Sequence, residues 1–414
     1  MRDRLNVRIV VLVFLALSVS LPIAFVSLAK LLLFFAGFYY LLAKHLSTST
    51  NDTEPALASV SVILLCIAVW SISVWLTVAD QDQALIAFVK HGKLLTIPIL
   101  IYVVRTKQEA HYGIMALVLG QALVLMSSWL MALDIPLPWV MRPSGVGNVL
   151  TEFVPYADSY LDQSIMLATT AGLLWHTSHD EKARWKRWLA IAALLNVLLL
   201  MPGRTGYILA IAATCLMAFF EIPLRWRGQA AFLIPLTLSL GLFYSVPQFQ
   251  QRVALAAQEF TAYEKAPDNQ TSIGARLNMW KLSLQAIQIQ PAGGYGIGNW
   301  TPTIKRLQGS DAEALFGSGN GSNPHQELLL WSVELGALGA ILFVALFVTL
   351  VHDTQHLGPR QRRAYLSVVV MLAITCMFNS PLYDDLLGDY FCVAIGLLMA
   401  LGLRDNSNAT QSQG

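Results

Sequence analysis

Long runs of apolar residues dominate the chain and constrain its fold more than any other feature. A helix needs about 20 apolar residues to cross the hydrocarbon core of a bilayer. The sequence contains twelve runs that approach this length. The predicted spans are 9–21, 23–42, 56–79, 84–104, 112–132, 160–176, 188–201, 205–221, 229–246, 326–351, 364–380 and 386–403. The first two share one apolar run, and Pro22 is expected to divide it.

The composition agrees with a membrane location for most of the chain. Only 13% of the 414 residues are charged, whereas 56% are hydrophobic. A water-soluble protein of this size needs roughly 25% charged residues to cover its surface. A net charge of +2 is too small for a nucleic-acid-binding protein. The sequence therefore predicts an all-α polytopic membrane protein with about 12 transmembrane helices, whose main surroundings are membrane lipids.

Basic residues in the short loops predict the orientation of the spans, because cytoplasmic loops carry an excess of Lys and Arg. With a cytoplasmic N-terminus, sixteen basic residues fall in inner segments and only four in short outer loops. The four outer residues are Lys90, Lys93, Arg142 and Arg204. We therefore expect both termini to be cytoplasmic.

One predicted outer segment, residues 247–325, is long and polar. It divides the chain into transmembrane helices 1–9 (residues 1–246), a loop domain (247–325), and transmembrane helices 10–12 with a cytoplasmic tail (326–414). A helical stripe within it predicts an amphipathic helix over 273–289, followed by a glycine-rich turn at 293–298. The stripe consists of Ile273, Leu277, Trp280, Leu284 and Ile287.

Three arginines on the predicted outer side are candidate ligands for a phosphate. Arg204 lies in the turn Met201-Pro-Gly-Arg-Thr-Gly206, at a helix N-terminus where a cation is unfavourable by ~0.3–1 kcal/mol. Arg142 lies in a short outer loop and Arg276 in the 273–289 helix. Guanidinium groups suit bidentate phosphate binding. The alternative for Arg204 is a plain interfacial arginine, for Arg142 an ordinary loop charge, and for Arg276 a solvated helix face.

His325 is a candidate general base. Asn323 fits the N-cap of the tenth span, Pro324 its first position and Gln326 its third, which would place His325 in the first helical turn. The positive helix end and the nearby arginines favour a neutral imidazole, which can accept a proton. The alternative is a histidine that only helps to cap the helix.

Four further residues are weaker candidates for an auxiliary or acceptor-binding role. Lys90 and Lys93 would add positive charge near a phosphate, or would anchor the fourth span at the membrane interface. Asp389 belongs to an acidic outer patch that would hold a sugar acceptor or balance the arginines, and Trp300 closes the glycine-rich turn. The sequence has no metal-binding pattern, so we expect no metal and no cofactor.

Several short motifs resemble those of the O-antigen ligase and polymerase superfamily. They are Pro202-Gly-Arg204-Thr-Gly206, Arg276-Leu-Asn-Met-Trp280, Pro291 with Gly294-Tyr-Gly-Ile-Gly-Asn-Trp300, and Asn323-Pro-His325-Gln-Glu-Leu328 followed by Gly336 and Gly339. The number of spans and the long outer segment before a late span are also similar to this superfamily.

The resemblance implies an integral-membrane glycosyltransferase of the bacterial inner membrane, with a periplasmic active site. It implies metal-independent, inverting transfer of O-antigen polysaccharide from undecaprenyl pyrophosphate to the lipid A–core oligosaccharide. Arg204, Arg276 and His325 match the essential residues of the family, with Arg142 as a third candidate ligand of the donor pyrophosphate.

Other functions stay open at this point. An O-antigen polymerase or a protein O-oligosaccharyltransferase would use the same donor and a different acceptor. A polysaccharide or lipid transporter would carry ionisable residues at mid-bilayer depth. Lys30 is the one obvious mid-span charge in the sequence, whereas the other unusual charges lie near one surface, which favours an enzyme.

Overall fold

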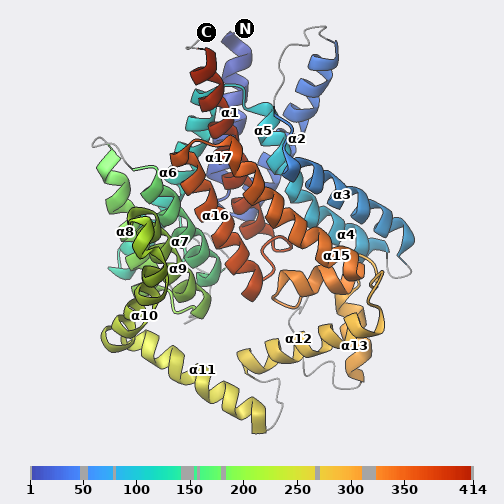
Figure 1. The fold of residues 1–414 in the computed structure, drawn as a ribbon, viewed down its shortest axis with the longest axis vertical. Coiled ribbons are helices and arrows are strands. Elements are labelled where there is room, and N and C mark those ends of the chain that lie inside the picture. The colour runs from blue at the N-terminus through green and yellow to red at the C-terminus, as the bar shows by residue number, and fades with distance from the viewer. Residues whose placement is uncertain are drawn as a thin grey trace.

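The computed structural model of the chain describes residues 2–46, 55–77, 81–140, 153–155, 159–178, 183–265, 271–309 and 323–411. Within these ranges the regular secondary structure is helical, without strands. The protein is thus an all-α polytopic membrane protein, as the apolar runs predict. Figure 1 shows both termini at one end of the molecule and helices α11, α12 and α13 at the opposite end.

The helices follow the predicted spans closely along the whole chain. Their bounds are α1 Arg2–Ser18, α2 Ile23–Leu46, α3 Ala58–Leu76, α4 Gln81–His91, α5 Thr96–Val103, α6 Lys107–Ala132, α7 Tyr160–His176, α8 Arg184–Leu200, α9 Arg204–Glu221, α10 Arg227–Ser245, α11 Pro247–Lys265, α12 Ser272–Ile289, α13 Trp300–Gln308, α15 Glu327–His352, α16 Pro359–Phe378 and α17 Asp385–Gln411.

Nine helical segments in the described part of the chain are long and apolar enough to cross a membrane. Helices α1, α7 and α8 coincide with the other three predicted spans, and each has 17 residues. At 1.5 Å per residue they are about 26 Å long, slightly shorter than a hydrocarbon core of about 30 Å. The difference between nine and twelve spans therefore arises from these three short helices.

Local sequence explains where several of the helices begin and end. Helix α1 ends at Ser18 and α2 begins at Ile23, so the long apolar run is divided around Pro22 as expected. Helix α6 begins five residues before its predicted span, because Thr106 and Glu109 form a capping box. The predicted fourth span is continuous from Gln81 to Val103 but contains a 3₁₀ turn between α4 and α5.

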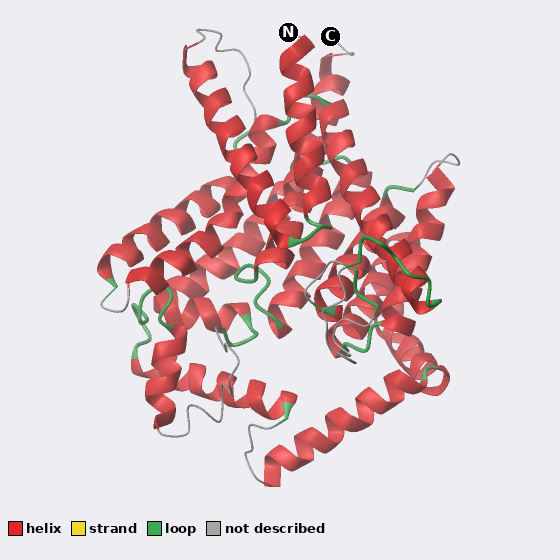
Figure 2. Ribbon diagram, turned by 180° about the vertical axis from the view of Figure 1, so that it is seen from behind, coloured by secondary structure: helices red, strands yellow, loops and turns green. Residues whose placement is uncertain are grey.

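Helix α17 lies at the centre of the helical bundle. It contacts α2, α5, α6, α7 and α16, and Figure 2 shows the surrounding helices from the opposite side. The Tyr390 and Thr170 hydroxyls form a 2.7 Å hydrogen bond between α17 and α7. The apolar core is therefore built around the last helix of the chain.

Helix α15 is interrupted at Gly336, where the backbone adopts φ 61° and ψ −143°. The glycine-rich turn pairs with the interrupted backbone. The Tyr295 N–H donates to the Val333 carbonyl (3.0 Å), the Gly296 N–H to the Glu334 carbonyl (2.8 Å), and the Ala337 N–H to the Pro291 carbonyl (2.7 Å). Backbone groups at membrane depth must be satisfied within the protein, and this turn satisfies those at the break.

The predicted amphipathic helix at 273–289 is confirmed as α12, and Gln290 follows its last residue. Its predicted stripe is only partly right, because Leu284 is 52% exposed. The buried residues of α12 are Gly274, Met279, Ser283 and Ala286. Small side chains on this face allow close packing, so a search for large apolar residues places the buried face incorrectly.

The close contact at the break in α15 makes a prediction about stability. An alanine at Gly336 would place its Cβ 2.5 Å from the Ala292 carbonyl oxygen, at a positive φ. This backbone region at positive φ alone costs about 1–3 kcal/mol for a residue other than glycine. We expect Gly336→Ala to lower the melting temperature of the purified protein in detergent.

Gly241→Ala is the matched control, because a Cβ at Gly241 in α10 meets no atom within 4 Å. Alanine is favoured over glycine in a helix by about 1 kcal/mol, so this variant should be as stable as the wild type or slightly more stable. Equal melting temperatures for the two variants would contradict the role given to Gly336.

Candidate active site

Arg204 is the first residue of α9, and small neighbours allow its turn to pack against α7. A Cβ on Gly203 would lie 2.8 Å from the Tyr160 ring, and one on Gly206 would lie 2.7 Å from the Ser164 hydroxyl. The Arg204 guanidinium forms a 3.0 Å ion pair with Glu259 of α11. Its buried Nε has no hydrogen-bond partner among the described residues. Arg204 therefore keeps one donor unused.

Glu259 connects this arginine to the N-terminus of α12. The same carboxylate oxygen, Oε2, accepts hydrogen bonds from Arg204 Nη1 at 3.0 Å and from the Ile273 N–H at 3.2 Å. A helix N-terminus and an arginine together form a favourable environment for an anion. The sequence did not single out Glu259, because a lone carboxylate on a polar helix has no characteristic spacing.

Arg276 lies in the first half of α12, close enough to Arg204 for their charges to interact. Burial and the positive charge of Arg204 lower the pKa of Arg276, while Tyr160 and Glu259 oppose this effect. The Glu259 carboxylate, which pairs with Arg204, thus also lies close enough to Arg276 to interact with its charge. The group carries a net positive charge that an added anion would offset.

The structure places His325 outside the helix in which it was expected. Helix α15 begins at Glu327, and its N-cap is Gln326, whose side chain accepts a hydrogen bond from the Leu329 N–H. The predicted cap at Asn323 is therefore wrong. Asn323 instead accepts a 2.9 Å hydrogen bond from the His325 N–H. This local turn competes with the helix, as short polar side chains often do.

The turn that carries His325 is held from both sides. His325 itself has a positive φ of 50°, which is uncommon for a residue other than glycine. The Trp280 indole N–H of α12 donates to the Pro324 carbonyl at 3.0 Å. The Asn323 amide also reaches the Asp384 carboxylate at 3.4 Å. The contact with α12 brings the histidine to the helix that carries Arg276.

The environment of His325 keeps its imidazole neutral. Burial and the positive charge of Arg276 lower its pKa to about 4. A neutral imidazole can accept a proton. The structure therefore brings together three of the predicted site residues, Arg204, Arg276 and His325. Arg276 lies close enough to each of the other two for its charge to affect them or be affected.

Of the remaining candidates, Lys93 lies near the His325 turn, because it contacts Asp384, the residue that Asn323 also contacts. Arg142 lies outside the described residues. Lys90 lies over the Tyr383 ring, 4.3 Å from its centroid. Lys93 is buried and donates to the Asp384 carbonyl oxygen, so it is not an interfacial anchor.

Asp389 is buried in α17 and forms a 2.7 Å ion pair with Lys30 of α2. Another buried acidic residue, Glu334, lies inside the α15 span and contacts His91 at 3.5 Å. Lys30 is therefore not alone as a mid-span charge, and that expectation from the sequence is wrong. Lys30 and Asp389 are paired with each other, as buried charges in membranes generally are.

Trp300 serves the packing of the outer helices. It is 1% exposed, begins α13, and donates its indole N–H to the Ser283 hydroxyl of α12 at 2.9 Å. Its buried position joins α12 to α13 and leaves no ring face for a sugar. The described residues also contain no cluster of three or more His, Cys, Asp or Glu side chains that could hold a metal ion.

The fold and this site define a polytopic membrane protein with two arginines and a neutral histidine at the end opposite its termini. Residues 189–344 match the family described as O-Antigen ligase. This match supports the resemblance of the chain to the O-antigen ligase and polymerase superfamily. Arg204, Arg276 and His325 all lie inside the matched segment. No curated protein matches the sequence.

The link between Arg276 and His325 makes a prediction about titration. Arg276→Gln removes a nearby positive charge, so the pKa of His325 should rise from about 4 toward its ordinary value. The pKa is measured from the pH dependence of imidazole acylation by diethylpyrocarbonate, with the modified peptide identified by mass spectrometry. Lys281→Gln on the same helix is the control. An unchanged pKa of His325 in Arg276→Gln would contradict the electrostatic interaction between the two side chains.

Proposed function

We propose that the protein is an O-antigen ligase. It would transfer O-antigen polysaccharide from undecaprenyl pyrophosphate to a hydroxyl of the lipid A–core oligosaccharide, and so complete lipopolysaccharide. The family match supports ligase or polymerase activity in general. The observation that carries the proposal is that Arg204, paired with Glu259, lies near Arg276, and that Arg276 lies near the neutral imidazole of His325.

The donor pyrophosphate would bind where the Glu259 carboxylate now lies. That position already has two donors, the Arg204 guanidinium and the N-terminus of α12. Guanidinium groups bind phosphate oxygens in bidentate fashion. Arg142 would be a further ligand. An apolar pocket of about 200 Å³ beside the Arg204 turn, lined in part by Tyr160 and Pro202, would receive the first part of the prenyl chain.

His325 would act on the acceptor. The acceptor hydroxyl oxygen attacks the anomeric carbon of the donor, and the bond from this carbon to the pyrophosphate oxygen breaks with inversion. The proton passes from the hydroxyl to His325, and the electron pair leaves with undecaprenyl pyrophosphate. The arginines stabilise the charge that develops on this leaving group, so the reaction would need no divalent cation. The bound pyrophosphate would also raise the pKa of His325 and make it a better base.

The topology supports a reaction at the outer surface of the bacterial inner membrane. Both termini lie at the end of the molecule opposite α11–α13 (Figure 1), as an even number of spans requires. The excess of basic residues assigns the end with the termini to the cytoplasm. The site would therefore be periplasmic and accessible to both lipid-linked substrates.

His325→Ala tests the role of the histidine. We expect ligation to fall by about 10²–10⁴-fold, the usual contribution of a general base, whereas donor binding should stay within about threefold of the wild type. Ligation is measured with purified protein, and donor binding by equilibrium titration of undecaprenyl pyrophosphate. His111→Ala, at an exposed position near the start of α6, is the control. Lost donor binding with retained turnover would refute the assignment.

Glu259→Gln tests whether the carboxylate marks the pyrophosphate position. The substitution removes the negative charge that competes with the donor, so donor affinity should rise about two- to fivefold, the range for a partly exposed charge pair. Glu264→Gln on the same helix should leave donor affinity unchanged. Weaker donor binding in Glu259→Gln would show that Glu259 helps to bind the donor and does not compete with it.

The acceptor is tested by the lipopolysaccharide of a deletion strain. A strain without the ligase should show lipid A–core that carries no O-antigen. Core carrying a single repeat would indicate a polymerase, and unchanged lipopolysaccharide would indicate a protein O-oligosaccharyltransferase or a protein with another role.

A further inference from the structure

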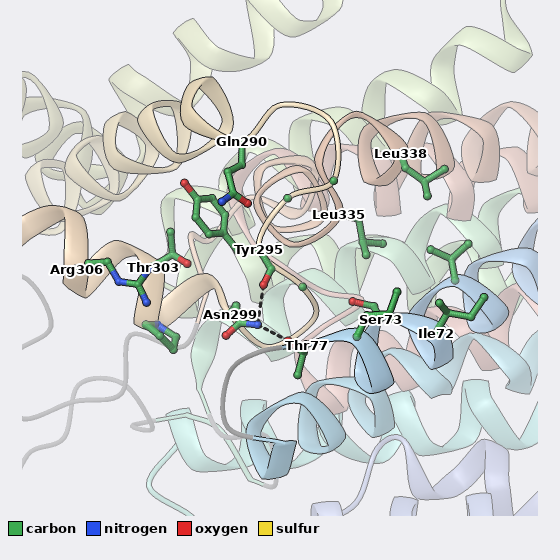
Figure 3. Close-up of a pocket in the computed structure, with 16 residues that line it drawn as sticks. Ile72, Ser73, Thr77, Gln290, Tyr295, Asn299, Thr303, Arg306, Leu335 and Leu338 are labelled. Carbon is green, nitrogen blue, oxygen red and sulfur yellow. Dashed lines mark hydrogen bonds between the residues drawn. The ribbon is translucent and has the colours of Figure 1, made fainter.

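A second concave site lies apart from the arginine and histidine site. It is a groove of about 550 Å³ between α3, α13, α15 and the glycine-rich turn (Figure 3). Gln290 at the end of α12 borders it, whereas Arg276 lies 14 residues earlier on the same helix. This separation is about 21 Å along the helix axis. The groove is therefore distinct from the proposed donor site.

One wall of the groove faces the bilayer. It is formed by apolar side chains of two membrane-spanning helices, α3 and α15. Ile72 is 57% exposed, Leu76 74% and Leu338 45%. In a membrane-spanning segment such residues contact lipid tails. This wall offers a surface that an acyl chain can follow.

The opposite wall is polar and carries an arginine. Gln290, Thr303 and Arg306 lie together on this side of the groove (Figure 3). Arg306 is exposed and has no ion pair within the described residues. The Asn299 amide, by contrast, already donates to the Tyr295 carbonyl at 2.8 Å and to the Thr77 hydroxyl at 2.6 Å. The Asn299 amide is therefore occupied, whereas the exposed Arg306 guanidinium can bind a ligand.

We propose that this groove binds one phospholipid of the surrounding bilayer, with its phosphate at Arg306 and an acyl chain along Ile72 and Leu338. The groove has an apolar wall in the membrane and a cationic, hydrogen-bonding wall, and this arrangement matches an amphiphile with an anionic headgroup. Arginine binds phosphate oxygens through charge-assisted hydrogen bonds.

Gly293 provides a way to block the groove without damaging the fold. It lines the groove, and a Cβ at this position would meet no atom within 4 Å. A leucine here would therefore extend into the open space. Gly228 in α10 also has nothing within 4 Å of an added Cβ and lies outside the groove. Gly228→Leu is thus the matched control for Gly293→Leu.

The test is native mass spectrometry of the delipidated protein titrated with phosphatidylglycerol, and in parallel with diacylglycerol, which lacks the phosphate. We expect the wild type to bind one phosphatidylglycerol tightly. Arg306→Ala should weaken this binding about tenfold, the effect of losing a hydrogen bond to a charged group. Gly293→Leu should abolish it, whereas Gly228→Leu and Lys281→Ala should bind as the wild type does.

Three outcomes would overturn the proposal. Equal affinity in the wild type, Arg306→Ala and Gly293→Leu would show that the lipid binds elsewhere. Equal affinity for diacylglycerol would show that the phosphate is not recognised. Displacement of phosphatidylglycerol by one equivalent of undecaprenyl pyrophosphate would assign the groove to the lipid-linked substrate. Equal melting temperatures of the two glycine variants would confirm that lost binding in Gly293→Leu does not reflect misfolding.

Discussion

An interrupted helix in a bilayer must find new partners for the backbone groups that the interruption frees, and much of this structure depends on how α15 does so. The break at Gly336 is satisfied by the glycine-rich turn, whose backbone bonds to Val333, Glu334 and Ala337. The Glu334 side chain adds a 2.9 Å hydrogen bond from the Gly298 N–H. The turn in this way fixes the end of α12 and the start of α13, the two helices that border the sites.

The proposed active site follows from that arrangement. Helix α12 carries Arg276, and its Trp280 holds the turn with His325 through the Pro324 carbonyl. Its N-terminus meets Glu259 together with Arg204. Helix α12 thus connects the proposed base, the two arginines and the position of the Glu259 carboxylate. Burial supports the chemistry, because it keeps His325 neutral and strengthens the interaction of the arginines with a bound anion.

The sequence predicts most of the fold, because a membrane span leaves a strong and simple signal in the apolar pattern. It predicts Arg204 and Arg276 for a related reason, since each is a cation on the predicted outer side of a chain that is poor in charge. His325 stays a predicted site residue, whereas its predicted place in the first helical turn is wrong. The choice between a helical cap and a local turn at Asn323 depends on Trp280, which is distant in sequence.

Other features left no pattern in the sequence. Glu259 is one acidic residue on a polar helix, and its importance comes only from the residues that fold around it. The pairing of Lys30 with Asp389 joins α2 to α17, and no local spacing predicts such a contact. Gly336 belongs to one of the short motifs, but the break that it makes in α15 depends on the turn at 293–298, which no local pattern places beside it.

The central claim is that this chain alone, with arginines in place of a metal ion, joins a lipid-linked polysaccharide to a lipid acceptor. The most direct measurement is transfer in vitro by the purified protein, with undecaprenyl-pyrophosphate-linked O-antigen, lipid A–core and a chelator of divalent cations. The account predicts that O-antigen appears on lipid A–core under these conditions. No product, or product only after a divalent cation is restored, would contradict it.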